Sequence, residues 1–397
     1  MSSKTKPINF GIAPSEAWPH FADDEIAAVS DVLRSGKVNQ WTGERVKKFE
    51  AAMAARIGAP YAVALANGSL ALEVALRALG VGPRDEVIVT PASFVASASC
   101  VRMVGATPVF ADVESDSQNI SAATVEPHIT PATRAIIAVH LAGWPVDMAP
   151  LMALAEQHGI TVIEDCAQSI GALIDGKPAG SFGHAAAFSF CQDKIISTGG
   201  EGGMALFRDQ DSFKRAWSLK DHGKGFDLMQ TPGDTRGFRF VHEAVGTNYR
   251  MTEMQAAIGL LQLAKLDVWL ETRAANAAIW RYALTDCAAL RLPEPPTHMS
   301  HANYKLTAFL RPDALKPGIS RDDVLAALIE GGLRAFSGFC PEIYLEKAFA
   351  DLEIGVRPSA HDLGQWSLMF EIHPTIDQDA LKARAVHARS LIDSFQI

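Results

Sequence analysis

The feature that most restricts the fold of this chain is a regular alternation of short apolar segments with longer amphipathic ones. The short segments have the composition of buried strands. Most of them are followed by a segment whose apolar residues recur at helical spacing. The predicted strands are Tyr61–Leu65, Glu86–Thr90, Pro108–Phe110, Arg134–His140 and Ile160–Glu164. Strands that alternate with helices at this spacing predict a parallel or mostly parallel sheet covered by helices on both faces.

Polar or aromatic residues follow several of these strands. Because parallel strands end at the same edge of a sheet, and ligands bind at that edge, residues far apart in the sequence are expected to converge there. The residues in question are Asn67, Gly68, Ser69, Phe94, His140 and Asp165.

A single lysine lies between two further apolar segments. Ala185–Phe190 and Met204–Phe207 predict strands, and Lys194 lies on the loop between them, before the glycine-rich turn Gly199–Gly203. A lysine ammonium that is partly desolvated has a lowered pKa and becomes a nucleophile towards carbonyl groups. A lone lysine is usually a solvated surface residue, so the interpretation of Lys194 depends on its context.

Two of the strand ends have both an ordinary and a chemical interpretation. Asn67-Gly68-Ser69 opens a helix, where backbone N–H groups and a hydroxyl bind phosphate, but Asn-Gly is also a common turn. Asp165 either caps the next turn or pairs with a ring nitrogen that must stay protonated. The second arrangement is typical of pyridoxal phosphate (PLP) enzymes, in which a lysine forms the Schiff base.

Other chemical groups carry weaker predictions. His140 is either a hydrogen-bonded core residue or a substrate contact, and His222 is either a loop residue or a substrate contact. Glu164 and Asp165 alternate along a strand, so they point to opposite faces and do not form a carboxylate pair.

The glycine cluster Gly199–Gly203 lacks the GxGxxG and P-loop spacing of nucleotide-binding loops. The 5 cysteines show no CxxC motif, so neither disulfides nor a metal site are predicted.

Composition excludes several classes of protein. The 397 residues are 48% hydrophobic and 20% charged, which is typical of a soluble globular protein. The net charge of −9 argues against nucleic acid or an anionic membrane as a partner. No run of apolar residues is long enough to span a membrane. The first residues lack the apolar core of a signal peptide, so a cytoplasmic location is expected.

The rest of the chain predicts a second, smaller domain. Met251–Leu284 has a long helical pattern that leads out of the first domain. We expect a large domain over residues 1–280, with the first 20 or so residues left free to pack elsewhere, and a small α+β domain over residues 281–397. The glycine-rich segment Gly223–Val241 is expected to be irregular.

Several segments, taken in order over residues 20–270, resemble one family. As a set they are similar to the DegT/DnrJ/EryC1/StrS family of fold type I sugar aminotransferases, while the last third is similar only in outline. The segments are Gly43, Asn67–Ser69, Val139–Gly143, Ile163–Ser169, Phe188–Gly203 and Asn248–Ala257.

The resemblance implies a PLP-dependent homodimer whose active site is shared between subunits. It assigns the Schiff base to Lys194, the contact with the pyridine nitrogen to Asp165 and the ring stack to Phe94. It places Gln168 near the phenolic oxygen of the cofactor. The phosphate contacts that it implies are Gly68, Ser69 and Ser189.

Two more assignments concern the neighbouring subunit and the substrate. The resemblance implies that Asn248 reaches the phosphate of the neighbouring subunit and that Arg250 lies near the amino donor or the sugar nucleotide. Cys191-Gln192-Asp193 departs from the proline or threonine that commonly precedes the lysine, so the substrate contacts there are expected to differ. Relatives with histidine in place of lysine act as sugar dehydratases, which disfavours that activity here.

The implied reaction moves an amino group from L-glutamate to a nucleotide-activated keto sugar, with the pyridoxamine form of the cofactor (PMP) between two half-reactions. Such a product serves amino-sugar, lipopolysaccharide or secondary-metabolite biosynthesis. The alternatives are transamination of a keto-cyclitol, a PLP-dependent dehydratase and a regulator without catalysis. The sequence shows no basic helix-turn-helix extension that would favour the regulator.

Overall fold

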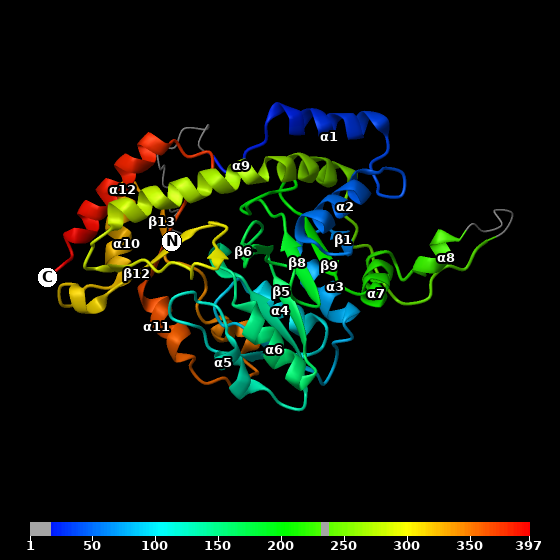
Figure 1. Cartoon of the computed structure of the whole chain (residues 1–397), viewed down its shortest axis with the longest axis horizontal. Coiled ribbons are helices and arrows are strands. Elements are labelled where there is room, and N and C mark those ends of the chain that lie inside the picture. The colour runs from blue at the N-terminus through cyan, green and yellow to red at the C-terminus, as the bar shows by residue number, and fades with distance from the viewer. Residues whose placement is uncertain (1–16, 232–237) are drawn as a thin grey trace, which may run out of the picture.

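The computed structural model describes residues 17–231 and 238–397. Its centre is a seven-stranded sheet in the order β1-β9-β8-β5-β4-β2-β3 (Figure 1). The strands are β1 (Tyr61–Leu65), β2 (Glu86–Val89), β3 (Thr107–Phe110), β4 (Thr133–Val139), β5 (Thr161–Asp165), β8 (Ala185–Ser189) and β9 (Gly203–Phe207). Strand β9 runs antiparallel to β1 and β8, and the other neighbours are parallel. The predicted mostly parallel sheet is confirmed.

Helices cover both faces of this sheet, as predicted. Val63 and Leu65 point to one face and pack in a core with residues of α3 and α4. Ala62 and Ala64 point to the other face and pack with residues of α2 and α9, because successive side chains on a strand alternate. The helices of this part are α1 (Asp23–Ser35), α2 (Arg45–Ile57), α3 (Gly68–Ala78), α4 (Ala96–Met103), α5 (Ala122–Val125), α6 (Met148–His158), α7 (Gln210–Lys220) and α9 (Glu253–Leu284).

The long helix α9 links the central sheet to the C-terminal part of the chain (Figure 1). Thr252 starts it in a capping box, in which its side chain accepts a hydrogen bond from the N–H of Gln255. Lys265 pairs with Glu25 of α1 at 2.8 Å. Further along, Trp280 stacks on Phe370 of a second sheet with ring centroids 4.3 Å apart. The helix therefore packs on both parts of the molecule.

The second sheet is antiparallel and has four strands in the order β10-β12-β14-β13. Its strands are β10 (Leu290–Arg291), β12 (Leu306–Leu310), β13 (Ala335–Phe336) and β14 (Ser367–Phe370), and its helices are α10 (Arg321–Glu330), α11 (Pro358–Trp366) and α12 (Gln378–Asp393). Ser320 caps α10. Ile343 and Phe349, however, pack in the core of the large sheet. The domain limit at 280/281 stays a prediction, because C-terminal residues contribute to both cores.

Two features depart from the sequence-based expectation. The segment predicted to be irregular contains α8 (Phe226–Gln230), which projects from the body (Figure 1); residues 232–237 of that segment lie outside the described residues. A small sheet of β6 (Leu173–Ile174), β7 (Lys177–Pro178) and β11 (Met299–Ser300) was not expected. Among the helices of the described residues, none is long and apolar enough to cross a membrane.

Candidate active site

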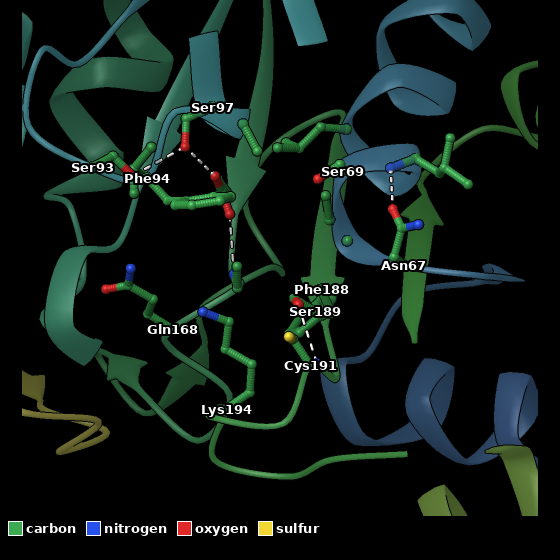
Figure 2. Close-up of a pocket in the computed structure, with 18 of the residues that line it drawn as sticks. Asn67, Ser69, Ser93, Phe94, Ser97, Gln168, Phe188, Ser189, Cys191 and Lys194 are labelled. Carbon is green, nitrogen blue, oxygen red and sulfur yellow. Dashed lines mark hydrogen bonds between the residues drawn. The ribbon is translucent and has the colours of Figure 1, made fainter. Parts of the chain in front are cut away.

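A cavity of about 700 Å³ lies at the carboxyl ends of β1, β4, β5 and β8. This is the edge at which ligands bind in open α/β sheets. Figure 2 shows Phe94, Gln168 and Lys194 pointing into the same space from three different segments. Of the predicted site residues, those that line the cavity are Gly68, Ser69, Phe94, Asp165, Gln168, Ser189 and Lys194.

Asp165, the last residue of β5, places a buried carboxyl at the wall of the cavity. One oxygen accepts a hydrogen bond from Ser97 Oγ at 2.8 Å, and the other accepts one from the N–H of Ala167 at 3.1 Å. Burial raises the pKa of Asp165, although these hydrogen bonds act in the opposite direction. A buried carboxylate in this state is stabilised by a cationic partner. The N–H of a protonated pyridine ring would be such a partner.

Lys194 lies on the loop after β8, and its side chain is 15% exposed. Its ammonium nitrogen is 3.3 Å from Asp193 Oδ2 and lies 5.2 Å from the centre of the Tyr304 ring. The indole N–H of Trp18 donates to the carbonyl oxygen of Lys194 at 2.9 Å. The carboxylate of Asp193 is therefore the hydrogen-bond partner of this ammonium.

The start of α3 forms a cradle of backbone N–H groups beside Ser189. Asn67 caps the helix by accepting a hydrogen bond from the N–H of Leu70 at 3.0 Å, which leaves the N–H groups of the first turn directed at the cavity. A Cβ on Gly68 would come within 2.6 Å of the Ser189 Cβ, and one on Gly203 within 2.2 Å of the Asn67 carbonyl oxygen. Glycine is required at both positions because the backbone segments approach so closely.

Gln168 and Phe94 complete the wall of the cavity. The amide oxygen of Gln168 accepts a hydrogen bond from the N–H of Ala142 at 2.7 Å, so its NH₂ group is left to donate towards the cavity. The ring of Phe94 is 64% exposed. An apolar ring exposed inside a cavity offers a face on which a planar ligand can stack.

Asn248, Arg250 and His222 do not line this cavity in the single chain. Asn248 and His222 are exposed. The guanidinium of Arg250 donates to Asp221 Oδ1 at 2.7 Å, and Asp221 also pairs with Lys224 at 3.1 Å. The structure therefore groups these residues in a separate cluster near the C-terminal end of α7, and their roles at the cofactor or substrate stay predictions.

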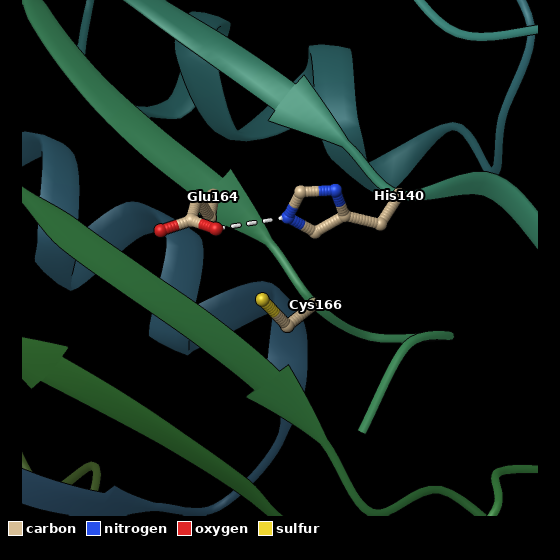
Figure 3. A group of neighbouring side chains, drawn as sticks. All are labelled: His140, Glu164 and Cys166. Atoms are coloured by element: carbon tan, nitrogen blue, oxygen red, sulfur yellow. Dashed lines mark hydrogen bonds and ion pairs between the residues drawn. The ribbon is translucent and has the colours of Figure 1, made fainter. Parts of the chain in front are cut away.

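His140 does not fit the substrate role that was one of its two predictions. Its ring is completely buried, its Nε2 lies 3.0 Å from Glu164 Oε2, and its Nδ1 accepts the N–H of Val146 at 2.9 Å (Figure 3). Both ring nitrogens are thus occupied by protein groups, with the proton on Nε2. The hydrogen-bonding alternative is the one that the structure supports.

His140, Glu164 and Cys166 place potential metal-ligand atoms within 4.8 Å of one another, but Glu164 is already satisfied. Its oxygens accept hydrogen bonds from the N–H groups of Gly180, Phe182 and Gly183 at 2.6–2.7 Å in addition to His140. Burial acts to raise the pKa of Glu164, and the hydrogen bonds from His140 and the backbone outweigh it, so the pKa is lowered. We assign the cluster a structural role.

Replacing Glu164 with glutamine is expected to destabilise the fold by about 3–5 kcal/mol, because an amide NH₂ would face buried N–H donors. The free energy of unfolding from urea titration measures this, with Glu156→Gln on the exposed side of α6 as the control. Because the folded pKa of Glu164 is lowered, its contribution should be lost as the pH falls through that folded value. A variant as stable as wild type would contradict the structural role.

Four further residues belong to this site although no role is predicted for them from the sequence: Trp18, Ser97, Asp193 and Tyr304. Trp18 and Tyr304 reach Lys194 and Asp193 across separations of 176 and 111 residues. Ser97 follows Phe94 by one helical turn, and that spacing was a signal that it shares the cavity. Asp193 precedes the lysine, and its difference from the family pattern marked it as a residue of interest.

The comparisons with known proteins identify the fold and the chemistry together. The sequence model of the DegT/DnrJ/EryC1/StrS aminotransferase family matches residues 19–387. The chain belongs to this family. As an aminotransferase of this family it is a PLP-dependent transaminase with the fold type I architecture, as the sequence predicted.

Individual relatives support the same assignment. The chain is 39% identical over 376 residues to a UDP-N-acetyl-3-dehydro-alpha-D-glucosamine 3-aminotransferase of Acidithiobacillus ferrooxidans, covering 94% of this chain and 96% of that protein. It is 33% identical over 372 residues to a pleiotropic regulatory protein of Geobacillus stearothermophilus, covering 92% and 93%. The X-ray structure of an aminotransferase from Psychrobacter cryohalolentis superimposes with a TM-score of 0.91 at 44% identity, covering 94% of this chain and 97% of that one.

The residues that line the cavity fit PLP. Asp165 supplies a buried carboxyl in need of a cationic partner, and Lys194 supplies an amine in the same cavity. The cradle at Gly68 provides N–H donors of the kind that bind phosphate. These groups have the donor and acceptor chemistry that the ring nitrogen, the aldehyde and the phosphate of the cofactor require.

Proposed function

We propose that this aminotransferase moves the amino group of L-glutamate to a nucleotide-linked keto sugar in two half-reactions. The observation that carries the proposal is that Lys194 and Asp165 both line one cavity at the carboxyl ends of the strands. The relative from Acidithiobacillus ferrooxidans supports a nucleotide-linked acceptor, because its name specifies a UDP-linked keto sugar and amination at C3.

When bound, PLP supplies the electron sink for loss of the proton from the carbon that bears the amino group. Lys194 Nζ would hold the cofactor in the resting enzyme, and would then take the α-proton of the donor as a general base and return it as a general acid. Asp165 would provide negative charge for the ring nitrogen. Phe94 would offer its ring for stacking, and the NH₂ group of Gln168 would donate to the phenolic oxygen. Gly68, Ser69 and Ser189 would hold the phosphate.

The same proposal includes a homodimer in the cytoplasm, with Asn248 binding the phosphate in the neighbouring subunit. The exposed position of Asn248 in the single chain supports this, because a residue that acts on another subunit must be accessible. Arg250 is held by a hydrogen bond to Asp221, and in this proposal it contacts the donor or the sugar nucleotide. His222 lies on the adjoining loop and is a further substrate contact in this proposal.

Three other activities are less well supported. A keto-cyclitol acceptor fits the same cavity chemistry and differs only in the acceptor. A dehydratase is disfavoured because the chain has lysine, not histidine, at position 194. The name of the relative from Geobacillus stearothermophilus points to regulation, but a site with a lysine and a buried carboxyl is typical of catalysis.

The test is a panel of acceptors offered to cofactor-loaded enzyme that has first been treated with L-glutamate and then freed of it. UDP-linked 3-keto and 4-keto sugars, the corresponding GDP sugars and a keto-cyclitol are compared, and the aminated product is identified by mass spectrometry. The proposal predicts amination of at least one nucleotide-linked sugar. Amination of the cyclitol alone, or loss of water from a sugar without amination, would overturn it.

A further inference from the structure

The carboxylate of Asp193 lies beside the ammonium of Lys194, and both residues line the cavity. Asp193 Oδ2 is 3.3 Å from Lys194 Nζ, and the Asp193 side chain is half exposed. Although desolvation acts to raise the pKa of Asp193, the charge of Lys194 and a hydrogen bond from Tyr304 outweigh it and lower the pKa. Asp193 therefore carries a negative charge next to the lysine at neutral pH.

Tyr304 also holds this carboxylate. Its hydroxyl donates a hydrogen bond to Asp193 Oδ2, the same oxygen that faces Lys194. Burial and the charge of Asp193 raise the pKa of Tyr304 well above its usual value, so the hydroxyl keeps its proton and remains a donor. One carboxylate oxygen is thus shared between a cation and a phenol.

The position of Tyr304 is fixed by the segment that carries it. Its N–H donates to the carbonyl of Ala142 at 3.1 Å, and the N–H of Ala302 donates to that of Gly143 at 2.8 Å. The ring of Tyr304 stacks on Phe339 with centroids 6.4 Å apart, and only 3% of the residue is exposed. A buried tyrosine tied to the turn after β4 is a rigid support for a residue on another loop.

We propose that Asp193 and Tyr304 are a positioning pair for Lys194 in this reaction. Asp193 is the counter-ion of Lys194 while the lysine is free and carries the proton taken from the donor, and Tyr304 holds Asp193 and moderates its charge. The proton passes only to and from Lys194 Nζ, and neither Asp193 nor Tyr304 changes protonation. The inference rests on the proposed function for its role in catalysis, but the pair itself can be tested without it.

Other groups near Lys194 must be kept constant in such a test. The Asp165 carboxyl and the Cys191 thiol line the same cavity and lie within electrostatic range of the lysine. Asp193→Asn removes only the nearest charge and keeps the shape of the side chain. Tyr304→Phe removes only the hydroxyl and keeps the ring beneath the ammonium.

The experiment is trace labelling of cofactor-free protein with acetic anhydride at fixed neutral pH, followed by peptide mass spectrometry. Only a neutral amine reacts, so the rate for Lys194 reports how strongly its ammonium form is stabilised; exposed Lys47 is the internal reference. Asp193→Asn should label Lys194 about three- to tenfold faster than wild type. Tyr304→Phe should label it about twofold slower, because the carboxylate loses a hydrogen bond that moderates its charge.

The two variants are expected to change the labelling rate of Lys194 in opposite directions, which distinguishes an electrostatic effect from a loosened structure. Asp193→Asn at the wild-type rate, or both variants faster than wild type, would overturn the pairing. In the cofactor-loaded enzyme, Asp193→Asn should lower kcat of the glutamate half-reaction and change KM little. An effect on KM alone would contradict a role in stabilising Lys194 while it carries the proton. Addition of PLP to wild type should block labelling of Lys194. If it does not, the proposed function fails, whatever the variants show.

Discussion

Replacing Lys194 with alanine is expected to abolish amino transfer while leaving the fold intact. The loss should be roughly 10³-fold or more, because the residue supplies both the nucleophile and the general acid–base group. Its ammonium contacts the half-exposed Asp193, and an interaction of this kind contributes about 1 kcal/mol or less to stability. Steady-state amination of the best acceptor and thermal unfolding of the same preparation measure the two effects.

Lys47→Ala is the matched control, because Lys47 is an exposed residue on α2. It should show wild-type activity and stability. Normal turnover in the Lys194 variant would remove the residue from the chemistry and, with it, the account of the site. A variant that fails to fold would contradict the expectation that the Lys194 side chain contributes little to stability.

The second large effect is expected for Asp165→Asn. The amide keeps the size of the side chain and can accept the N–H of Ala167, but it has no charge to stabilise a protonated ring nitrogen. We expect a loss of about 10²–10³-fold in kcat, comparable to the removal of one well-placed electrostatic group from an active site. Cofactor affinity, measured by equilibrium dialysis, should fall as well. A kcat within a few-fold of wild type would show that the charge of Asp165 is not used.

The same Asp165→Asn variant, which is expected to lose activity, should not lose stability in the cofactor-free protein. Burial raises the pKa of folded Asp165, so the wild-type protein loses stability as the pH rises from the ordinary aspartate value through the raised folded value. The asparagine variant has no such loss. Its Tm should therefore equal or exceed that of wild type at neutral pH and approach it in acid. A variant that is less stable at neutral pH would contradict this.

The sequence predicted the elements whose signals are local. The strand Tyr61–Leu65 appears with the predicted bounds, because its apolar composition and the flanking turn residues define it without help from distant residues. The topology then follows from the parallel sheet. It brings Gly68, Asp165 and Lys194 to one cavity, since residues at the carboxyl ends of neighbouring strands share an edge.

What the sequence did not predict depends on contacts between distant segments. Trp18 and Tyr304 reach the lysine loop only after the chain has folded, and no periodicity marks them. The pattern around His140 is the same for a core residue and for a substrate contact, and only the hydrogen bond to Glu164 separates the two. Helix α8 was missed because it is short and lies in a glycine-rich segment, where local propensity opposes a helix.

The most direct test of the central claim, that Lys194 holds PLP in this cavity, is the visible absorption spectrum of the purified protein with PLP, before and after L-glutamate. We predict a visible band from the lysine-linked cofactor that L-glutamate bleaches, and no such band in Lys194→Ala. A wild-type protein that takes up no cofactor would contradict the account at its root. A band that L-glutamate does not bleach would contradict the proposed donor.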